Sequence, residues 1–188
     1  MELSFDTNYL EVTSKEPGAL SISPEEEKEI IALSKDYQVH RKIIQSIAPS
    51  IYGYEHIKEA IMYQLFGGEP KNLQDIRIRG DIHILLIGDP ATAKSQLLQY
   101  VTRLAPRALY TSGRGSTGVG LTAAVLSTKE GMTLEAGALV LADTGVCCID
   151  ELDKIQLKDR DAIHTAMEQQ IVPINKGGIN ATLNAKTS

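Results

Sequence analysis

The chain has 188 residues, 43% of them hydrophobic and 23% charged, which is enough for one globular domain of ordinary size plus a short appendage. Its net charge of -5 excludes a protein that coats nucleic acid with its whole surface, so any such contact must come from local elements. The apolar runs are too short to span a bilayer and Met1 opens no secretory signal, so we expect no membrane partner.

The N-terminal part predicts a strand end followed by two helices. Residues 3–12 are typical of the end of a strand, and nothing precedes them to pair with, so we expect the sequence to begin inside a larger structure. Ser23 and Glu26 form the pattern of a capping box at the start of a helix. Apolar spacing over 39–47 predicts a second helix. Together they predict a helical connector over 21–49.

From Ser50 onward the pattern becomes an alternation of helices and strands. A helix with apolar residues from Ile57 to Leu65 stops at the pair Gly67-Gly68. The order predicted after it is strand 83–87, a loop, helix 96–104, strand 109–111, a glycine-rich segment 113–120, a helical piece 121–126, a polar turn 127–131, the stretch 135–142, strand 146–150, helix 159–169, and two strand-like runs, 171–174 and 179–183, around a turn at 175–178. Such alternation predicts a parallel sheet covered by helices on both faces, and the last two runs predict a β-hairpin.

The loop after the first predicted strand has the pattern of a phosphate-binding loop, because residues 88–95 read Gly-Asp-Pro-Ala-Thr-Ala-Lys-Ser. A glycine turn before a helix N-terminus directs several backbone N–H groups at one point, where the helix dipole favours negative charge. We predict that Lys94 reaches the terminal phosphates of a nucleotide and that Ser95 binds Mg²⁺. The nucleotide contacts predicted for this loop come from Gly88, Asp89, Pro90, Ala91, Thr92, Ala93, Lys94, Ser95 and Gln96.

An ordinary strand-turn-helix with an exposed lysine is the alternative, and the alanines at Ala91 and Ala93 favour it, since the general pattern has glycine at the second of these positions.

A second polar element follows the apolar run 146–149, which is typical of a central parallel strand and ends in Asp150 and Glu151. At the C-terminal end of that strand Asp150 is expected to face the same crevice as the loop, which is where open α/β sheets bind ligands. We predict that Asp150 holds Mg²⁺ through water ligands and that Glu151 polarises an attacking water. Taken alone, an Asp-Glu pair after a strand is more often a helix N-cap, and the upstream loop is what favours nucleotide chemistry. Cys147 and Cys148 point to opposite faces of the strand and are predicted to pack as buried thiols in a reducing compartment.

Several blocks occur in one order: Ser46–Gly53, Leu65–Gly68, Ile78–His83, the loop 88–95, Leu134–Asp143, Ile149–Glu151 and Ala166–Gln170 before a lysine-tipped hairpin. Together they resemble the minichromosome maintenance (MCM) replicative helicases, and the archaeal members look closest. The resemblance covers nearly the whole chain, and so many blocks in one order make it specific.

The resemblance implies an AAA+ P-loop NTPase fold, a three-layer sandwich with a parallel central sheet and inserted β-hairpins that point into the channel of a hexameric ring. It implies ATP and Mg²⁺ as cofactors, with Lys94, Asp150 and Glu151 as catalytic residues. Single- or double-stranded DNA is the implied partner, contacted by Lys176 at the tip of one hairpin and by Lys129 in the other. In a protein without this resemblance, Lys176 is more typical of a solvated turn lysine.

The same family has alanine at the position of Ala93 but glycine at that of Ala91. If the loop needs a positive φ at Ala91, the alanine costs on the order of 1 kcal/mol and lowers nucleotide affinity accordingly.

The domains implied are a last strand of an OB region with a linker at 1–20, the connector at 21–49, and an AAA+ core at 50–188 that is expected to lack its sensor asparagine, arginine finger and lid. The implied function is that of an ATP-dependent DNA helicase subunit in replication, acting in a homo-hexamer, cytoplasmic and chromosome-associated, or nuclear in a eukaryote. The isolated fragment is expected to be nearly inactive. One alternative is a catalytically weak nucleotide-binding scaffold, which Ala91 and the lacking elements favour. The other is a different AAA+ remodelling ATPase such as a chelatase subunit, against which the block at 166–170 counts.

Overall fold

The computed structural model describes residues 22–188 apart from residue 74, the segments 115–117 and 129–130, and residue 177. The chain divides into two compact units, Met1–Tyr37 and Gln38–Ser188. The strand end predicted at 3–12 lies outside the described residues, and the domain limits predicted above stay predictions.

The first unit contains helix α1, Pro24–Ser34. Its start confirms the predicted capping box, because the Ser23 side chain accepts the Glu26 N–H at 3.3 Å and the Ser23 N–H donates to Glu26 Oε2 at 2.8 Å. These two bonds satisfy backbone donors that a helix start otherwise leaves unpaired.

The second unit begins with α2 (Val39–Ser46) and α3 (Glu55–Phe66), which are joined by a loop around a buried lysine. Lys58 is only 6% exposed, and its Nζ donates to Ala48 O at 3.1 Å and to Ile51 O at 2.7 Å. A buried ammonium group needs such partners, and here they fix the loop between the two helices. A short hairpin, β1 (Lys71–Asn72) with β2 (Arg77–Ile78), follows. The sequence analysis missed it because two-residue strands carry no alternation to detect.

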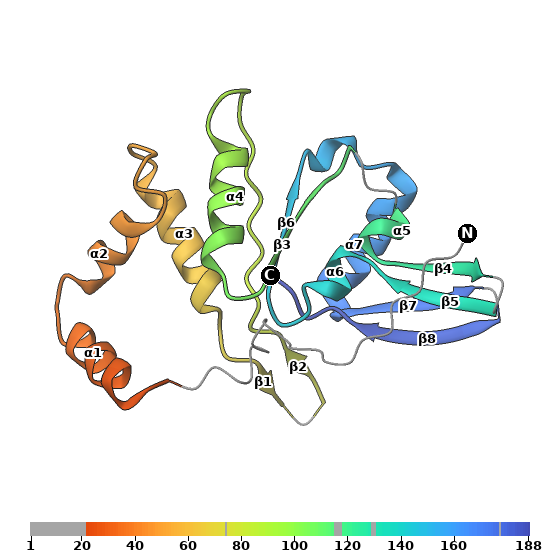
Figure 1. Ribbon diagram of the computed structural model, residues 1–188, viewed down its shortest axis with the longest axis horizontal. Helices are drawn as coiled ribbons and strands as arrows, with labels where there is room; N and C mark the ends of the chain where they lie inside the picture. Colours follow the sequence, from red (N-terminus) through yellow and green to blue (C-terminus); the bar gives the residue numbers. More distant parts are fainter. Residues whose placement is uncertain (1–21, 74, 115–117, 129–130, 177) are drawn as a thin grey trace, which may run out of the picture. The chain divides into compact units, whose positions relative to one another are not determined.

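A parallel pair of strands forms the centre of the second unit. These strands are β3 (Ala108–Ser112) and β6 (Val146–Asp150), and their register pairs Tyr110 with Cys148 and Ser112 with Asp150. Helix α4 (Lys94–Leu104) covers one face, and α5 (Gly118–Leu121), α6 (Ala138–Leu141) and α7 (Leu157–Gln169) lie on the other (Figure 1). The predicted parallel sheet with helices on both faces is therefore present.

The strand predicted at 83–87 is wrong, because the structure assigns no strand to this segment. Leu85 and Ile87 are 66% and 87% exposed, whereas Ile84 packs on the core. Just before this segment, Arg79 donates to the Met167 carbonyl at the end of α7. Strand β3 pairs with one edge of β6. Near the first residues of β6, the other edge is occupied by the end of the chain, since the Cys147 N–H donates to Ser188 O at 2.9 Å. An apolar run forms a ladder only where a partner strand is free to receive it.

Two antiparallel hairpins complete the unit. In the first, β4 (Ala123–Thr128) pairs with β5 (Gly131–Ala136), so the helical piece predicted at 121–126 is wrong. Helix α5 ends at Leu121, and pairing with β5 imposes strand conformation on the residues after it. The second hairpin, β7 (Ile171–Lys176) with β8 (Ile179–Asn184), confirms the prediction, although its strands are longer and its turn is shorter than expected.

Two hydrophobic clusters fill the second unit. The first cluster joins α2, α3, α4 and one face of the parallel strands, and its buried members are Ile44, Ile47, Ala48, Ile61, Met62, Leu97, Val101, Val146 and Cys148. The second cluster joins α5, α6, α7 and the β7–β8 hairpin, and its buried members are Leu121, Ala138, Leu139, Ile155, Ile163, Ala166, Val172, Ile174 and Ala185. Across the described ranges, no helix has the length and apolar character needed to cross a membrane.

Candidate nucleotide-binding site

The loop 88–95 closes around the amine of Lys94. Its Nζ donates to Gly88 O at 2.8 Å, to Asp89 O at 2.5 Å and to Thr92 Oγ1 at 3.0 Å. The Thr92 hydroxyl in turn donates to Asp89 O at 2.8 Å. The ammonium group is thus held within its own loop, and contact with an anion requires it to exchange these carbonyl oxygens for anion oxygens.

Two alanines give this loop its backbone path. Ala91 has φ +65° and Ala93 has φ +62°, both in the left-handed region. Such a conformation costs an alanine on the order of 1 kcal/mol more than a glycine, so the condition attached above to Ala91 is met. Ala93 is also the N-cap of α4, and the first helical turn leaves its N–H groups without helical partners at the loop. A helix N-terminus of this kind attracts anions.

The end of β6 meets this helix start through Asp150 and Ser95. A hydrogen bond from the Ser95 hydroxyl is the main reason that the pKa of Asp150 lies below its ordinary value, and the nearby Lys94 charge adds to the effect. Asp150 Oδ2 also accepts the Tyr110 hydroxyl at 2.7 Å, and Oδ1 accepts the Glu151 N–H at 2.9 Å. The structure therefore brings Asp150 close to the neighbouring pair Lys94 and Ser95, from which it is far removed in the sequence.

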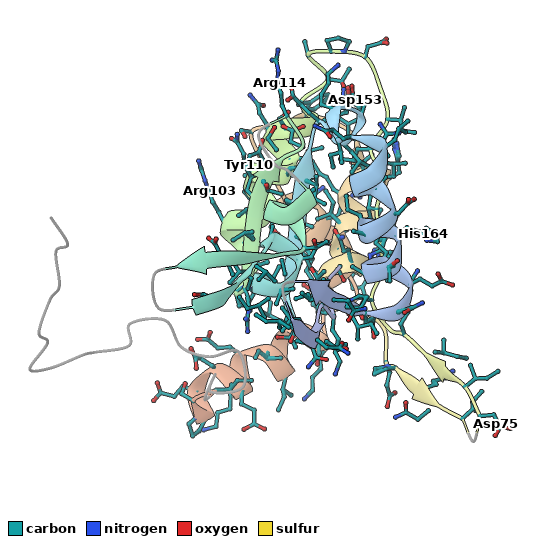
Figure 2. The ribbon with its side chains drawn as sticks, turned by 90° about the vertical axis from the view of Figure 1, so that its right-hand side faces the viewer. Asp75, Arg103, Tyr110, Arg114, Asp153 and His164 are labelled. Carbon is teal, nitrogen blue, oxygen red and sulfur yellow. The ribbon has the colours of Figure 1, made fainter. Side chains whose placement is uncertain are left out.

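Tyr110 and Ser112 are site residues that the sequence analysis missed. The Ser112 hydroxyl donates to Glu151 Oε2 at 3.3 Å. The hydrogen bond to Asp150 is the main reason that the pKa of Tyr110 lies above its ordinary value, so this phenol stays a donor. In Figure 2, Tyr110 lies below Arg114 and Asp153, which follow β3 and β6 along the chain. Alternation along β3 puts Tyr110 and Ser112 on one face, but only the pairing with β6 directs that face to the carboxylates.

Glu151 is held in an uncommon backbone conformation directly after β6. Its φ is +50°, and the Gly113 N–H donates to the carbonyl of the preceding Asp150 at 2.8 Å. It precedes the short 3₁₀ helix η2 (Leu152–Lys154) but makes no capping hydrogen bond with its side chain. Glu151 thus occupies the N-cap position that the helix-cap alternative gives it, although its side chain makes no capping bond. Strained residues of this kind cluster at active sites.

The donor set at this end of the sheet fits Mg²⁺. Mg²⁺ favours hard oxygen ligands and binds through one or two carboxylates plus substrate phosphates and water. Asp150 and Ser95 are an oxygen pair of that kind, and they lie close enough together for Ser95 to lower the pKa of Asp150. In the described part of the chain no three His, Cys, Asp or Glu side chains gather into a metal-binding group.

The two lysines predicted to contact DNA belong to the hairpins. Lys176 is the last residue of β7 and pairs with Ile179 next to the turn, whereas Lys129 lies outside the described residues. Figure 1 shows the β7–β8 hairpin beside β4–β5, on the side of the parallel strands away from α4. The structure thus separates the hairpins from the nucleotide loop, and DNA contact by either lysine stays a prediction.

Comparison with known proteins gives consistent matches. The family profile described as the MCM P-loop domain matches residues 26–188. The chain is 59% identical to the "Minichromosome maintenance protein MCM" of Saccharolobus solfataricus, over 100% of this chain and 28% of that protein. It is 52% identical to the "DNA replication licensing factor mcm7" of Schizosaccharomyces pombe, over 97% of this chain and 24% of that protein. It is 53% identical to the "DNA replication licensing factor mcm5" of Dictyostelium discoideum, over 97% of this chain and 25% of that protein. The chain thus spans about a quarter of the length of these curated relatives.

Proposed function

The chain belongs to the MCM family, and from this premise we propose that it is the ATP-binding and ATP-hydrolysing part of a replicative DNA helicase subunit. One observation carries the proposal: α4, whose start holds the phosphate-binding loop, packs against β6, and Ser95 and Lys94 lie close enough to Asp150 at the end of β6 to lower its pKa. The names of the relatives, which refer to minichromosome maintenance and replication licensing, support a role in DNA replication.

In this proposal the loop binds the phosphates of ATP. The Lys94 ammonium leaves the carbonyls of Gly88 and Asp89 for the terminal phosphates, and the N–H groups in the first turn of α4 contact the phosphate oxygens. Ser95 and Asp150 are the residues that would hold the Mg²⁺ of the bound nucleotide. When bound there, Mg²⁺ neutralises charge on the phosphates and so favours phosphoryl transfer.

Glu151 is the residue that activates water in this proposal. Its carboxylate is exposed at the end of β6, and the Ser112 hydroxyl orients it. An attacking water needs an acceptor for its proton and a fixed direction of approach, and a held carboxylate supplies both. An arginine from a neighbouring subunit of a hexamer is proposed to complete the charge stabilisation.

The two hairpins, β4–β5 and β7–β8, are proposed to contact DNA. The AAA+ sandwich is proposed to place β4–β5 and β7–β8 in the channel of a hexameric ring, with Lys176 and Lys129 near the DNA backbone. A net charge of -5 agrees with such local contacts and argues against broad coating of DNA. The proposed location is at the chromosome, in the cytoplasm or, for a eukaryotic source, in the nucleus.

A nucleotide-binding scaffold with little turnover is the second candidate, and two observations favour it. Ala91 is strained at φ +65°, and Lys94 is bonded to the carbonyls of its own loop. Both lower the affinity for phosphates relative to a relaxed, open loop. Turnover measured in a complete subunit separates the two candidates, because a scaffold binds ATP without hydrolysing it. A different AAA+ remodelling ATPase loses its support, since the chain belongs to the MCM family.

Calorimetry with Ser95→Ala tests the proposed function. The parent is expected to bind a non-hydrolysable ATP analogue more tightly with Mg²⁺ than with EDTA, and Ser95→Ala is expected to lose this gain. Ser46→Ala is the matched control, because the Ser46 hydroxyl donates to Ile43 O at 2.7 Å in α2. Equal gains from Mg²⁺ in the parent and in Ser95→Ala would contradict the assignment of this site.

A further inference from the structure

We propose that Tyr110 is a positioning residue for Asp150: its hydroxyl holds the carboxylate in the orientation that receives the Mg²⁺ of a bound nucleotide. The inference rests on the proposed function, and it concerns a residue on a different strand from the two carboxylates.

The geometry around the carboxylate carries the inference. The Tyr110 hydroxyl donates to Asp150 Oδ2 at 2.7 Å, while the Glu151 N–H donates to Oδ1 at 2.9 Å. A carboxylate can turn about its last torsion, which has broad wells. Two donors on different oxygens, one from β3 and one from the backbone after β6, stop that rotation. The lone pairs that stay available then keep a constant direction relative to Ser95.

The tyrosine is itself fixed between the two elements that build the site. The register places Tyr110 opposite Cys148, so it lies two residues before Ser112, the partner of Asp150, and on the same face. This is the face that α4 covers, and the Gln99 side chain of α4 lies near the Tyr110 hydroxyl. The Tyr110 hydroxyl therefore contacts the carboxylate at the end of β6 on the face covered by α4, the helix that begins with Lys94 and Ser95.

A second tyrosine shows how a purely structural hydroxyl behaves here. Tyr100 also belongs to the α4 region, but its hydroxyl donates to Ser46 O at 2.9 Å, a backbone carbonyl at the end of α2. That bond ties two helices together and contacts no site residue. Tyr110 donates instead to an ionised carboxylate, and hydrogen bonds to charged groups are shorter and stronger than neutral ones. Tyr100→Phe is therefore a matched control for Tyr110→Phe.

The test compares the affinity for a non-hydrolysable ATP analogue with Mg²⁺ and with EDTA, measured by calorimetry. Tyr110→Phe is expected to reduce the gain from Mg²⁺ on the order of tenfold, the usual scale for losing a hydrogen bond to a charged group, and to leave the affinity in EDTA unchanged. Tyr100→Phe is expected to keep the parental gain. Tyr110 is 37% exposed and the change removes one oxygen, so the fold is expected to persist, as circular dichroism can verify.

The ¹³C chemical shift of the Asp150 carboxyl group is a second measurement, and a general loss of stability does not change it. In protein labelled at the aspartate carboxyl carbon with ¹³C, the Asp150 resonance is assigned by its disappearance in Asp150→Asn. Tyr110→Phe is expected to shift this resonance in the nucleotide-free protein, and Tyr100→Phe is not. An unshifted resonance, or a gain from Mg²⁺ equal to that of Tyr100→Phe, overturns the inference alone. If the parent shows no gain from Mg²⁺, the proposed function fails and the inference fails with it.

Discussion

The two faces of β6 meet different regions of the second unit. On one face Val146 and Cys148 belong to the first hydrophobic cluster with α4, and the strand ends there in Asp150 beside the nucleotide loop. On the other face Cys147 and Ile149 pack against the second cluster, which holds α7 and the β7–β8 hairpin (Figure 1). One strand thus separates a region with a polar site at its edge from a region that supports a hairpin.

Because the two faces of β6 differ in this way, we expect substitutions on the α4 side and on the hairpin side to change different properties of the protein. Burial raises the pKa of the Cys147 thiol to about 12, so it packs as an unreactive apolar group on the hairpin side. The α4 side instead directs hydroxyl, carboxylate and ammonium groups to one place. Changes on the α4 side should alter nucleotide binding or hydrolysis, and changes on the other side should alter stability or DNA contact alone.

The largest effect is expected for Glu151→Gln in a complete subunit. The amide has the shape of the carboxylate but cannot accept a proton, so ATP turnover should fall by ~10²- to 10⁴-fold while nucleotide stays bound. Steady-state hydrolysis and equilibrium binding of the same preparation measure both. Glu168→Gln, an exposed position on α7 with His164 at 3.9 Å, is the control and should hydrolyse at the parental rate. Parental turnover in Glu151→Gln would remove this residue from the chemistry.

Truncating one leucine in each cluster sharpens the comparison. Leu97 in α4 is 2% exposed and Leu121 in α5 is 0% exposed. Either change to alanine should reduce the free energy of unfolding by about 2–5 kcal/mol, because each leaves a cavity in a packed core. At a temperature where both variants are folded, Leu97→Ala should also weaken nucleotide binding, and Leu121→Ala should not. Equal effects on nucleotide affinity would show that the two sides are not separate.

A smaller effect, of opposite sign, is expected at Ala91. Glycine adopts its φ of +65° without steric cost, so Ala91→Gly should gain on the order of 1 kcal/mol in stability or in nucleotide binding. Ala105→Gly is the matched control, since Ala105 has φ -71°, which alanine adopts without strain, so glycine should only destabilise by raising the entropy of the unfolded chain. Thermal unfolding with and without nucleotide measures both changes. If Ala91→Gly loses as much as the control, the strain at Ala91 is absent.

The smallest effect concerns the hairpin side. In a complete hexamer Lys176→Ala should weaken binding of single-stranded DNA modestly, and should lower the slope of its salt dependence by roughly one counterion per contributing subunit. ATP binding should stay at the parental level. Fluorescence anisotropy across a salt series measures affinity and slope, with Lys28→Ala in α1 as a control. Parental values of both, together with intact unwinding, would leave Lys176 as a solvated turn lysine.

Local motifs in the sequence were enough to predict the helix that follows the loop 88–95, the strand ending in Asp150 and the last hairpin. Each is encoded by residues that are neighbours in the chain. The segment 83–87 could not be judged in this way, because an apolar run forms a strand only with a partner, and the pairing is not local. Tyr110 was missed for the same reason. Its role depends on the register between β3 and β6, which the sequence pattern of either strand does not contain.

The central claim is that the polar edge beside α4 is a nucleotide site, and calorimetric titration of the chain with a Mg²⁺-bound, non-hydrolysable ATP analogue tests it most directly. The parent is expected to bind the analogue, and Lys94→Ala to lose affinity by at least on the order of 10²-fold, because several charge-assisted hydrogen bonds are lost together. The thermal unfolding curve should hardly change, since the hydrogen bonds that the structure gives for the Lys94 amine, among the described residues, all go to its own loop. Unchanged affinity in a folded Lys94→Ala variant would contradict the assignment of the loop, and with it the nucleotide site.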